Sequence, residues 1–272
     1  MSLTLGNLKL DGKCHVMGIL NVTPDSFYDG GKHFEASDAQ KRITSMVKEG
    51  VEIIDVGGES TRPGSKPVSI NEELERVIPA IEFIKSISDI PISIDTQKAE
   101  VAKKAVEAGA CVVNDVGGLR NEDMISTVSE LQIPVIIMHM QGTPENMQKN
   151  PQYGDVVEDI KNWLEERINA AEMAGIKRSN IIVDPGIGFG KNLKHNLEIL
   201  GSLDKFKGMS GGVLLGASRK SFIGMMTGVE DGDRLAGSLS AAIMGATAGV
   251  DLVRVHDVKE TRKTIETINV LN

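Results

Sequence analysis

Aromatic residues and excess basic charge are scarce in this 272-residue sequence. Phe, Trp and Tyr make up 3% of it, and 38 acidic residues outnumber 30 lysines and arginines, which gives a formal net charge of −8. Nucleic-acid binding normally requires a basic face, and single-strand binding also uses aromatic stacking platforms. The composition therefore excludes nucleic acid as an expected partner.

Cysteine and long apolar runs are also scarce. The two cysteines, Cys14 and Cys111, cannot build a disulfide framework and form no C-x-x-C pair. We interpret both as small apolar side chains buried in strands, which fits a reducing compartment. No apolar run reaches the length of a membrane span, and no signal-peptide pattern opens the sequence. We expect a cytoplasmic protein without a membrane partner.

The length and the apolar content suit one large domain. Hydrophobic residues make up 40% of the sequence, and 29 glycines allow many tight loops between strands and helices. A (β/α)8 barrel typically needs roughly 250 residues. We therefore expect one domain that spans residues 1–272.

Eight short apolar runs alternate with amphipathic helices, which is typical of a (β/α)8 barrel. The predicted strands are Val16–Leu20, Val51–Val56, Pro91–Ile94, Cys111–Val113, Val135–Met138, Ile181–Val183, Val213–Gly216 and Leu252–Val255. The alternative, an open doubly wound sheet, would normally show G-x-G-x-x-G after its first strand. The sequence instead has Asn21-Val-Thr-Pro there, so the barrel is favoured.

Local signals also predict how some elements begin. A hairpin at Leu3–Leu10, turning at Gly6-Asn7, is expected to close the bottom of the barrel. Ser37 with Gln40, and Ser69 with Glu72, are predicted to cap the first two helices.

The stretch Ile181–Gly190 predicts a functional site at the end of a strand. Three β-branched residues form a strand buried on both faces, and Asp184 ends it before Pro185 and a run of glycines. A carboxylate in that position lies where α/β enzymes place their chemistry, although a single Asp can equally cap the next helix. The recurrence of polar residues at other strand ends favours the functional interpretation.

Polar residues follow nearly every predicted strand, whereas the strand bodies are almost wholly apolar. The residues concerned, with a neighbouring loop included, are Asn21, Thr61, Arg62, Asp95, Asn114, Asp184, Lys220, Arg254 and His256. Because all strands of a barrel end at the same mouth, these side chains are expected to meet there.

Two chemistries are expected within this mouth. Asp95, Asn114 and Asp184 provide hydrogen-bond acceptors, which suit a flat heterocycle with an amino-pyrimidine edge. Met138 either lies against the face of that ring or simply packs in the core. The cations Arg62, Lys220 and Arg254, together with His256, suit a phosphate or diphosphate, the alternative being solvated surface charge.

The sequence contains no pattern for a dedicated metal cage. Its five histidines are scattered and show no H-E-x-x-H spacing. A transient Mg²⁺, held jointly by a ligand diphosphate and one or two protein oxygens, is compatible with the sequence, because Mg²⁺ retains waters and prefers phosphates.

With these residues identified, the sequence resembles the dihydropteroate synthase family along its whole barrel. The matching segments are Leu20–Phe27, Gly57–Gly64, Ile94–Thr96, Asn114-Asp115, Met138–Met140, Asp184–Gly190, Ser218–Ser221 and Arg254–Asp257. Tyr28 departs from the small polar residue that the family often has, which affects only the tip of the first loop.

The resemblance implies a transferase of folate biosynthesis. Its reaction condenses 6-hydroxymethyl-7,8-dihydropterin diphosphate with 4-aminobenzoate, giving 7,8-dihydropteroate and diphosphate with the help of Mg²⁺. It also implies a homodimer and inhibition by sulfonamides. Asp184, Lys220, Asn21 and Arg254 would be the catalytic residues, and Asn21 would lie beside Mg²⁺.

Substrate contacts follow from the same motif matches. The pterin would bind at Asp95, Asn114, Asp184 and Lys220. Independently of the motif matches, Met138 and Gly216 are further candidate substrate-binding residues. The diphosphate would meet Asn21, Thr61, Arg62, Arg254 and His256. The aminobenzoate would lie near Phe27, Pro63, Phe189, Lys220 and Ser221.

Two other functions compete with this reading. A corrinoid-dependent methyltransferase of the pterin-binding type would share Asp95 and Asp184 but has no use for the diphosphate group of cations. A catalytically silent pterin-binding protein would be expected to lack residues such as Asn21, Arg62 and Lys220, which are all present.

We also expect the loops Asn21–Gly31 and Glu59–Ser65, which are long and contain glycine, to be mobile without ligand.

Overall fold

Eight parallel strands close into a barrel in the order of the sequence, which confirms the predicted (β/α)8 fold. The computed structural model describes residues 3–23, 32–61, 64–228 and 233–271. The strands are β3 (His15–Asn21), β4 (Ile53–Gly57), β5 (Ile92–Asp95), β6 (Val112–Asp115), β7 (Val135–Met138), β8 (Ile181–Asp184), β9 (Gly212–Leu215) and β10 (Leu252–Val255). The ring closes where β10 pairs with β3.

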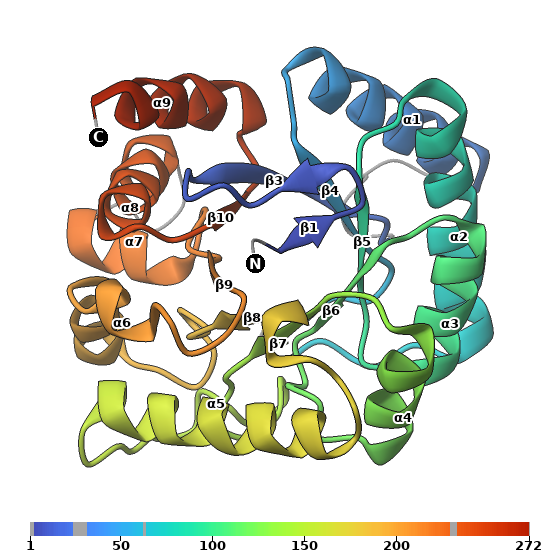
Figure 1. Ribbon diagram of the computed structural model, residues 1–272. Helices are drawn as coiled ribbons and strands as arrows, with labels where there is room; N and C mark the ends of the chain where they lie inside the picture. Colours follow the sequence, from blue (N-terminus) through green and yellow to red (C-terminus); the bar gives the residue numbers. More distant parts are fainter. Residues whose placement is uncertain (1–2, 24–31, 62–63, 229–232, 272) are drawn as a thin grey trace.

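Helices surround this ring on the outside (Figure 1). They are α1 (Lys32–Lys48), α2 (Ile70–Ile87), α3 (Ala99–Ala108), α4 (Glu122–Leu131), α5 (Val156–Met173), α6 (Leu193–Leu200), α7 (Ser221–Thr227), α8 (Leu235–Ala248) and α9 (Val258–Leu271). Their apolar faces pack on the outward-pointing strand residues; Ile160, Leu164 and Ile168 of α5, for example, are fully buried. Among the described residues, none of the helices has the length and apolarity needed to cross a membrane.

The lower half of the barrel interior is apolar, and the N-terminal hairpin closes it. Alternate residues of a strand point inward, and their lower layer forms one apolar cluster, Met17, Ile53, Val112, Ile136, Ile182, Leu214 and Leu252. Leu3, Leu5 and Leu10 from the hairpin of β1 (Thr4–Leu5) and β2 (Leu8–Lys9) belong to the same cluster. In Figure 1, β1 lies across the middle of the ring. The hairpin prediction is confirmed.

The first helix begins earlier than its capping pattern predicted. Ser37 was expected to precede the helix, but α1 starts at Lys32 and Ser37 lies inside it. A capping pattern is short and also occurs by chance within helices, so it fixes a boundary poorly. The second pattern was right about the boundary, because the side chain of Ser69 accepts a hydrogen bond from the backbone N–H of Glu72 at the start of α2. The side chain of Glu72 pairs with Arg76.

The strands also extend further toward the mouth than the apolar runs suggested. Asp95, Asn114 and Asp184 are paired within their ladders, since Asp95 pairs with Asn114 and Met138 with Asp184. In the opposite sense, β9 ends at Leu215 and leaves Gly216 outside it, while Cys14 and Cys111 lie immediately before strands rather than in them. The polar mouth is therefore built partly on the rigid sheet itself.

Candidate functional site

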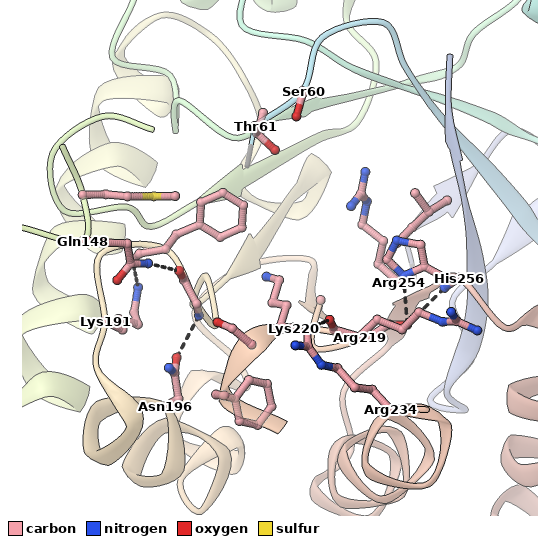
Figure 2. Close-up of a pocket in the computed structure, with 18 of the residues that line it drawn as sticks. Ser60, Thr61, Gln148, Lys191, Asn196, Arg219, Lys220, Arg234, Arg254 and His256 are labelled. Atoms are coloured by element: carbon pink, nitrogen blue, oxygen red, sulfur yellow. Dashed lines mark hydrogen bonds between the residues drawn. The ribbon is translucent and has the colours of Figure 1, made fainter. Parts of the chain in front are cut away.

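A cavity of about 790 Å³ opens at the carboxyl ends of the strands. Its wall contains nine of the residues predicted from the sequence: Asn21, Thr61, Asp95, Phe189, Gly216, Lys220, Ser221, Arg254 and His256. Lys220 occupies the middle of the view in Figure 2, between Lys191 on one side and Arg254 on the other. The strand-end argument thus correctly brought these residues together.

Three predicted residues lie below this wall. Asn114, Met138 and Asp184 are buried, with 3–5% of their surface exposed, and do not line the cavity. Met138 packs with Val116, Met140, Met147 and Phe189. Met138 therefore packs as a core methionine does. Its neighbour Phe189 lines the cavity.

Four positions named from the sequence lie outside the described residues. They are Phe27, Tyr28, Arg62 and Pro63. The expected behaviour of the loops Asn21–Gly31 and Glu59–Ser65 falls largely on the same gaps and stays a prediction.

A carboxylate and an amine both lie close to Gly216. A Cβ atom at position 216 would lie 3.6 Å from Oδ2 of Asp184 and 3.9 Å from Nζ of Lys220. The other oxygen of Asp184 accepts a hydrogen bond from the backbone N–H of Gly186 at 2.7 Å. Burial raises the pKa of Asp184, while Lys220 acts to lower it. The missing side chain at Gly216 leaves space next to both groups, into which a flat ligand can fit.

Lys220 is held between a carbonyl and an aromatic ring. Its ammonium group donates to the carbonyl oxygen of Ile187 and lies 4.4 Å from the ring centroid of Phe189. Burial is the main cause that lowers the pKa of Lys220 to about 8, and Asp184 opposes it. Lys220 therefore carries a positive charge at neutral pH that is lost under mildly alkaline conditions.

Arg254 lies deep in the mouth, bound to two carboxylates. Its Nε donates to Asp55 at 2.5 Å and one terminal nitrogen donates to Asp95 at 2.6 Å. Burial alone would lower the pKa of Arg254, but Asp55 and Asp95 more than offset it and raise that pKa. Arg254 and Asp95, which the sequence assigned to the cationic group and to the heterocycle group, are therefore paired with each other in this structure. The division of the mouth into two subsites for the ligand stays a prediction.

Asp55 is a site residue that sequence reasoning missed. It lies in the middle of β4, is fully buried, and also accepts a hydrogen bond from Nδ2 of Asn114 at 3.0 Å. Burial, with Asp55 as a nearby like charge, raises the pKa of Asp95 to about 7 against the opposing effect of Arg254. The sequence did contain a signal for this residue. Asp55 is a carboxylate in an otherwise apolar strand, and alternation along the strand places it on the same, inward face as Ile53 and Gly57.

His256 is fixed at the rim by Ser218. Its Nδ1 lies 3.1 Å from Oγ of Ser218, which also accepts from the His256 backbone N–H. The adjacent Asp257 pairs with Arg219 at 2.5 Å. These contacts join the end of β10 to the loop after β9 and place His256 in the cavity wall.

A buried lysine that the sequence did not single out supports the glycine-rich loop after β8. Lys191 donates to the carbonyl oxygen of Phe189 at 2.8 Å and lies 3.0 Å from Nδ1 of His139. Burial lowers the pKa of Lys191 well below its usual value, and lowers that of His139 to about 2. Gln148 adds a hydrogen bond to the carbonyl of Gly188 at 2.6 Å (Figure 2). Two side chains, Lys191 and Gln148, thus donate hydrogen bonds to the loop that carries Phe189.

Gly186 in that loop is required for steric reasons. Its φ of 70° lies in the left-handed region, and a Cβ there would collide with the carbonyl oxygen of His139. The close approach of the segments around Gly186 and His139 keeps the loop next to Asp184, which accepts a hydrogen bond from the Gly186 N–H.

No group of three or more His, Cys, Asp or Glu side chains within the described ranges could hold a metal ion. Asn21, whose amide oxygen is a possible metal ligand, lines the cavity, and its Oδ1 would lie 3.7 Å from a Cβ at Gly57. A fully protein-made cage is therefore not formed by these residues.

The comparison with known proteins matches this geometry. The family model described as "Pterin binding enzyme" matches residues 17–256. Dihydropteroate synthase of Escherichia coli K12 is 46% identical over 254 residues, which cover 93% of this chain and 90% of that protein.

Two solved structures extend the similarity to the whole fold. Dihydropteroate synthase of Yersinia pestis in a sulfonamide drug complex has a TM-score of 0.93 at 41% identity, over 100% of this chain and 99% of that one. The enzyme of Xanthomonas albilineans with 4-aminobenzoic acid has a TM-score of 0.91 at 44% identity, over 97% and 94%. With a barrel whose polar residues converge at one mouth, and with relatives of this identity over nearly its full length, the chain belongs to the pterin-binding enzyme family and, within it, to the dihydropteroate synthases, transferases of folate biosynthesis.

Proposed function

We propose that this chain condenses 6-hydroxymethyl-7,8-dihydropterin diphosphate with 4-aminobenzoate in the cavity at the barrel mouth, and that the residues described above have distinct roles. The observation that carries the proposal is that Asp184 and Lys220 both lie next to Gly216, which lines the cavity. A slot that offers both a hydrogen-bond acceptor and a cation suits a flat heterocycle with both donor and acceptor edges.

The pterin would bind at the floor of this slot. Asp184 and Asn114 accept hydrogen bonds from ring N–H and NH2 groups, and Lys220 donates to a ring acceptor. Asp95 would contribute to pterin binding through its negative charge and through its hydrogen bond with Arg254. Met138, beneath Phe189, would support the face of the ring.

The diphosphate would lie toward the rim, where Arg254 and His256 line the cavity. Arg254 has five N–H donors, and the described contacts with Asp55 and Asp95 use two of them. The remaining donors are available to phosphate oxygens. Asn21, Thr61 and Arg62 would complete this part of the site.

The charges suggest how the reaction proceeds. An arylamine is a weak nucleophile, so we expect the pterin C–O bond to break substantially before attack. Arg254 and His256 stabilise the departing negative charge, and the buried carboxylate of Asp184 stabilises the positive charge that spreads over the dihydropterin. The attacking nitrogen is neutral and loses its surplus proton late, so no strong general base is needed.

Magnesium fits the donors that the described residues offer. Mg²⁺ favours a few protein oxygens supplemented by phosphate and water, and the Asn21 amide is one suitable oxygen. When bound, the ion would neutralise charge on the leaving diphosphate. Asn21 would hold it and orient the diphosphate toward Arg254.

The aminobenzoate would enter last, between Phe189, Ser221 and the loops that contain Phe27 and Pro63. Sulfonamides, which mimic aminobenzoate, would occupy the same place. If these loops settle only around a bound diphosphate, a sulfonamide should bind much more tightly once pterin, diphosphate and Mg²⁺ are present. Calorimetric titration with and without those ligands tests this order, and equal affinities would mean that the pocket is preformed.

The decisive experiment for the activity is a product assay. The purified protein is mixed with Mg²⁺, the pterin diphosphate and aminobenzoate, and dihydropteroate is sought by mass spectrometry. Product that depends on all three additions is expected. Binding of pterin without product would favour a silent pterin-binding protein, and methyl transfer to a corrinoid would favour the methyltransferase alternative.

A homodimer is also proposed, through the helices that follow β8 and β9. Five large apolar side chains on α6, α7 and α8 are exposed by 37–64%, and these helices contact one another. They are Leu197, Met225, Met226, Ile243 and Met244. Such a shared apolar surface is typical of an interface. Light scattering should give twice the monomer mass, and Met244→Lys should shift the protein toward the monomer.

The two cysteines are compatible with a cytoplasmic location. Both are free, and Cys14 is buried while Cys111 is half-buried. A reducing compartment keeps such thiols unpaired. Fractionation of cells that express the tagged chain would test this location.

A further inference from the structure

Asp55 holds two site residues with a single carboxylate oxygen. Its Oδ2 accepts from Nδ2 of Asn114 at 3.0 Å and from Nε of Arg254 at 2.5 Å. Asp55 is fully buried and lies one layer below the rim, on the inner face of β4. Its other oxygen has no hydrogen-bond partner among the residues that the structure describes. A carboxylate buried in this way is costly to keep unless its contacts serve the site.

The contact with Asn114 decides which end of that amide faces the ligand. An Asn side chain has an NH2 end and a carbonyl end, which are nearly the same in shape and opposite in hydrogen bonding. Because a carboxylate accepts only, Asp55 can bind only the NH2 end. The carbonyl end of Asn114 is then left for other groups, as an acceptor.

The contact with Arg254 fixes the direction of the guanidinium. Asp55 binds Nε and Asp95 binds a terminal nitrogen, so the planar group is held at two points along one edge. Arg254 is thereby aligned before any anion arrives.

We infer that Asp55 is a positioning residue that sets Asn114 as an acceptor and aligns Arg254 for the leaving group, without touching substrate itself. Through Asn114 it selects a ring that presents donors, and through Arg254 it prepares the anion site. This inference rests on the proposed function, so the wild-type protein is tested first for binding of the pterin and for product.

The test compares Asp55→Asn with a matched neighbour, Ser93→Ala. Ser93 pairs with Asp55 across β4 and β5, is fully buried in the same interior, and its hydroxyl has no partner within the described part of the chain. The variant Asp55→Asn keeps the shape but removes the charge, so its amide can turn either way and no longer dictates the orientation of Asn114.

Calorimetry is carried out with 6-hydroxymethyl-7,8-dihydropterin and, separately, with inorganic diphosphate and Mg²⁺. Asp55→Asn should weaken each by about tenfold or more, since hydrogen bonds to a charged group are lost in both cases. Ser93→Ala should stay within about twofold of wild type.

Kinetics separate positioning from general damage. With Asp55→Asn the KM for the pterin diphosphate should rise several-fold while the KM for aminobenzoate changes little. A merely structural role would reduce the active fraction, which lowers kcat and leaves both KM values unchanged. That result in a variant with a normal circular dichroism spectrum, or unaltered affinity for both probes, would overturn the inference. Absence of pterin binding in the wild type would instead contradict the proposed function.

Discussion

Two basic side chains lie in the same barrel mouth, the half-buried Arg254 and the buried Lys191, and their surroundings differ. Arg254 is bound by the carboxylates of Asp55 and Asp95, whereas the contacts of Lys191 are the carbonyls of Phe189 and His139 and the ring of His139. The pKa of Arg254 is raised and that of Lys191 is lowered, although burial acts on both in the same direction. The carboxylates beside Arg254 offset the effect of burial on its pKa, whereas at Lys191 the effect of burial prevails.

This difference indicates that the two basic side chains have different roles. Arg254 keeps its positive charge and can bind an anion in the cavity. Lys191 acts mainly as a hydrogen-bond donor that holds the loop carrying Phe189. The comparison predicts that removing the two side chains has different consequences, which the following variants test.

The largest effect is expected for Arg254→Met. This change leaves Asp55 and Asp95 buried without their common partner, and breaking a buried ion pair in this way costs about 3–5 kcal/mol of unfolding free energy. Urea denaturation measures the loss. Binding should fall for the diphosphate-free pterin as well as for the pterin diphosphate, because Asp95 and Arg254 form one cluster. A loss restricted to the pterin diphosphate would support the predicted division into two separate subsites, and equal losses for both ligands would contradict it.

The second-largest effect is expected for Asp184→Asn, which should weaken pterin binding and leave the fold intact. Asp184 is the opposite charge that acts on Arg254, Lys191 and Lys220 together. Losing one charge-assisted hydrogen bond to the pterin should cost about 1.5–3 kcal/mol of binding free energy. Calorimetry with the pterin provides the measurement, and unchanged affinity in a folded variant would remove Asp184 from the site.

Lys191→Met should have a smaller effect on stability at neutral pH. The carbonyl of Phe189 loses its donor, a cost of about 1–3 kcal/mol, but the variant no longer buries an amine. The unfolded state binds a proton at Lys191 up to about pH 10.5, whereas the folded state releases it at lower pH because its pKa is lowered. Wild-type stability should therefore rise relative to Lys191→Met between pH 7 and pH 10. A constant difference over that range would mean that Lys191 keeps its charge when folded.

The smallest effect is expected for Lys220, whose pKa of about 8 lies between the raised pKa of Arg254 and the lowered pKa of Lys191. The charged amine is present at pH 7 and mostly lost at pH 9, so affinity for the dihydropterin should decline across that range. Lys220→Met should bind more weakly at pH 7 and show a flatter dependence. The same ligand is used for both proteins, so that its own ionisation cancels. Parallel pH curves would exclude Lys220 as the group that titrates.

The sequence by itself determined the barrel and most of its rim. Eight apolar runs separated by amphipathic helices are a repeated signal, and the polar residues at their ends must meet because parallel strands of a barrel end on the same side. Asp95, Asp184, Lys220 and Arg254 were accessible to this argument, since each stands at or just beyond an apolar run. Their convergence needs no knowledge of individual contacts.

Only the tertiary structure decided how these residues are paired. Asp55 and Arg254 are 199 positions apart, and Lys191 and His139 are 52 apart, so no local pattern joins them. Ring closure between β10 and β3 brings Arg254 over β4, and the tight turn at Gly186 brings the loop of Lys191 against His139. The charge that each buried group carries depends on these distant partners, because electrostatic interactions inside a protein act through space and strengthen as water is excluded.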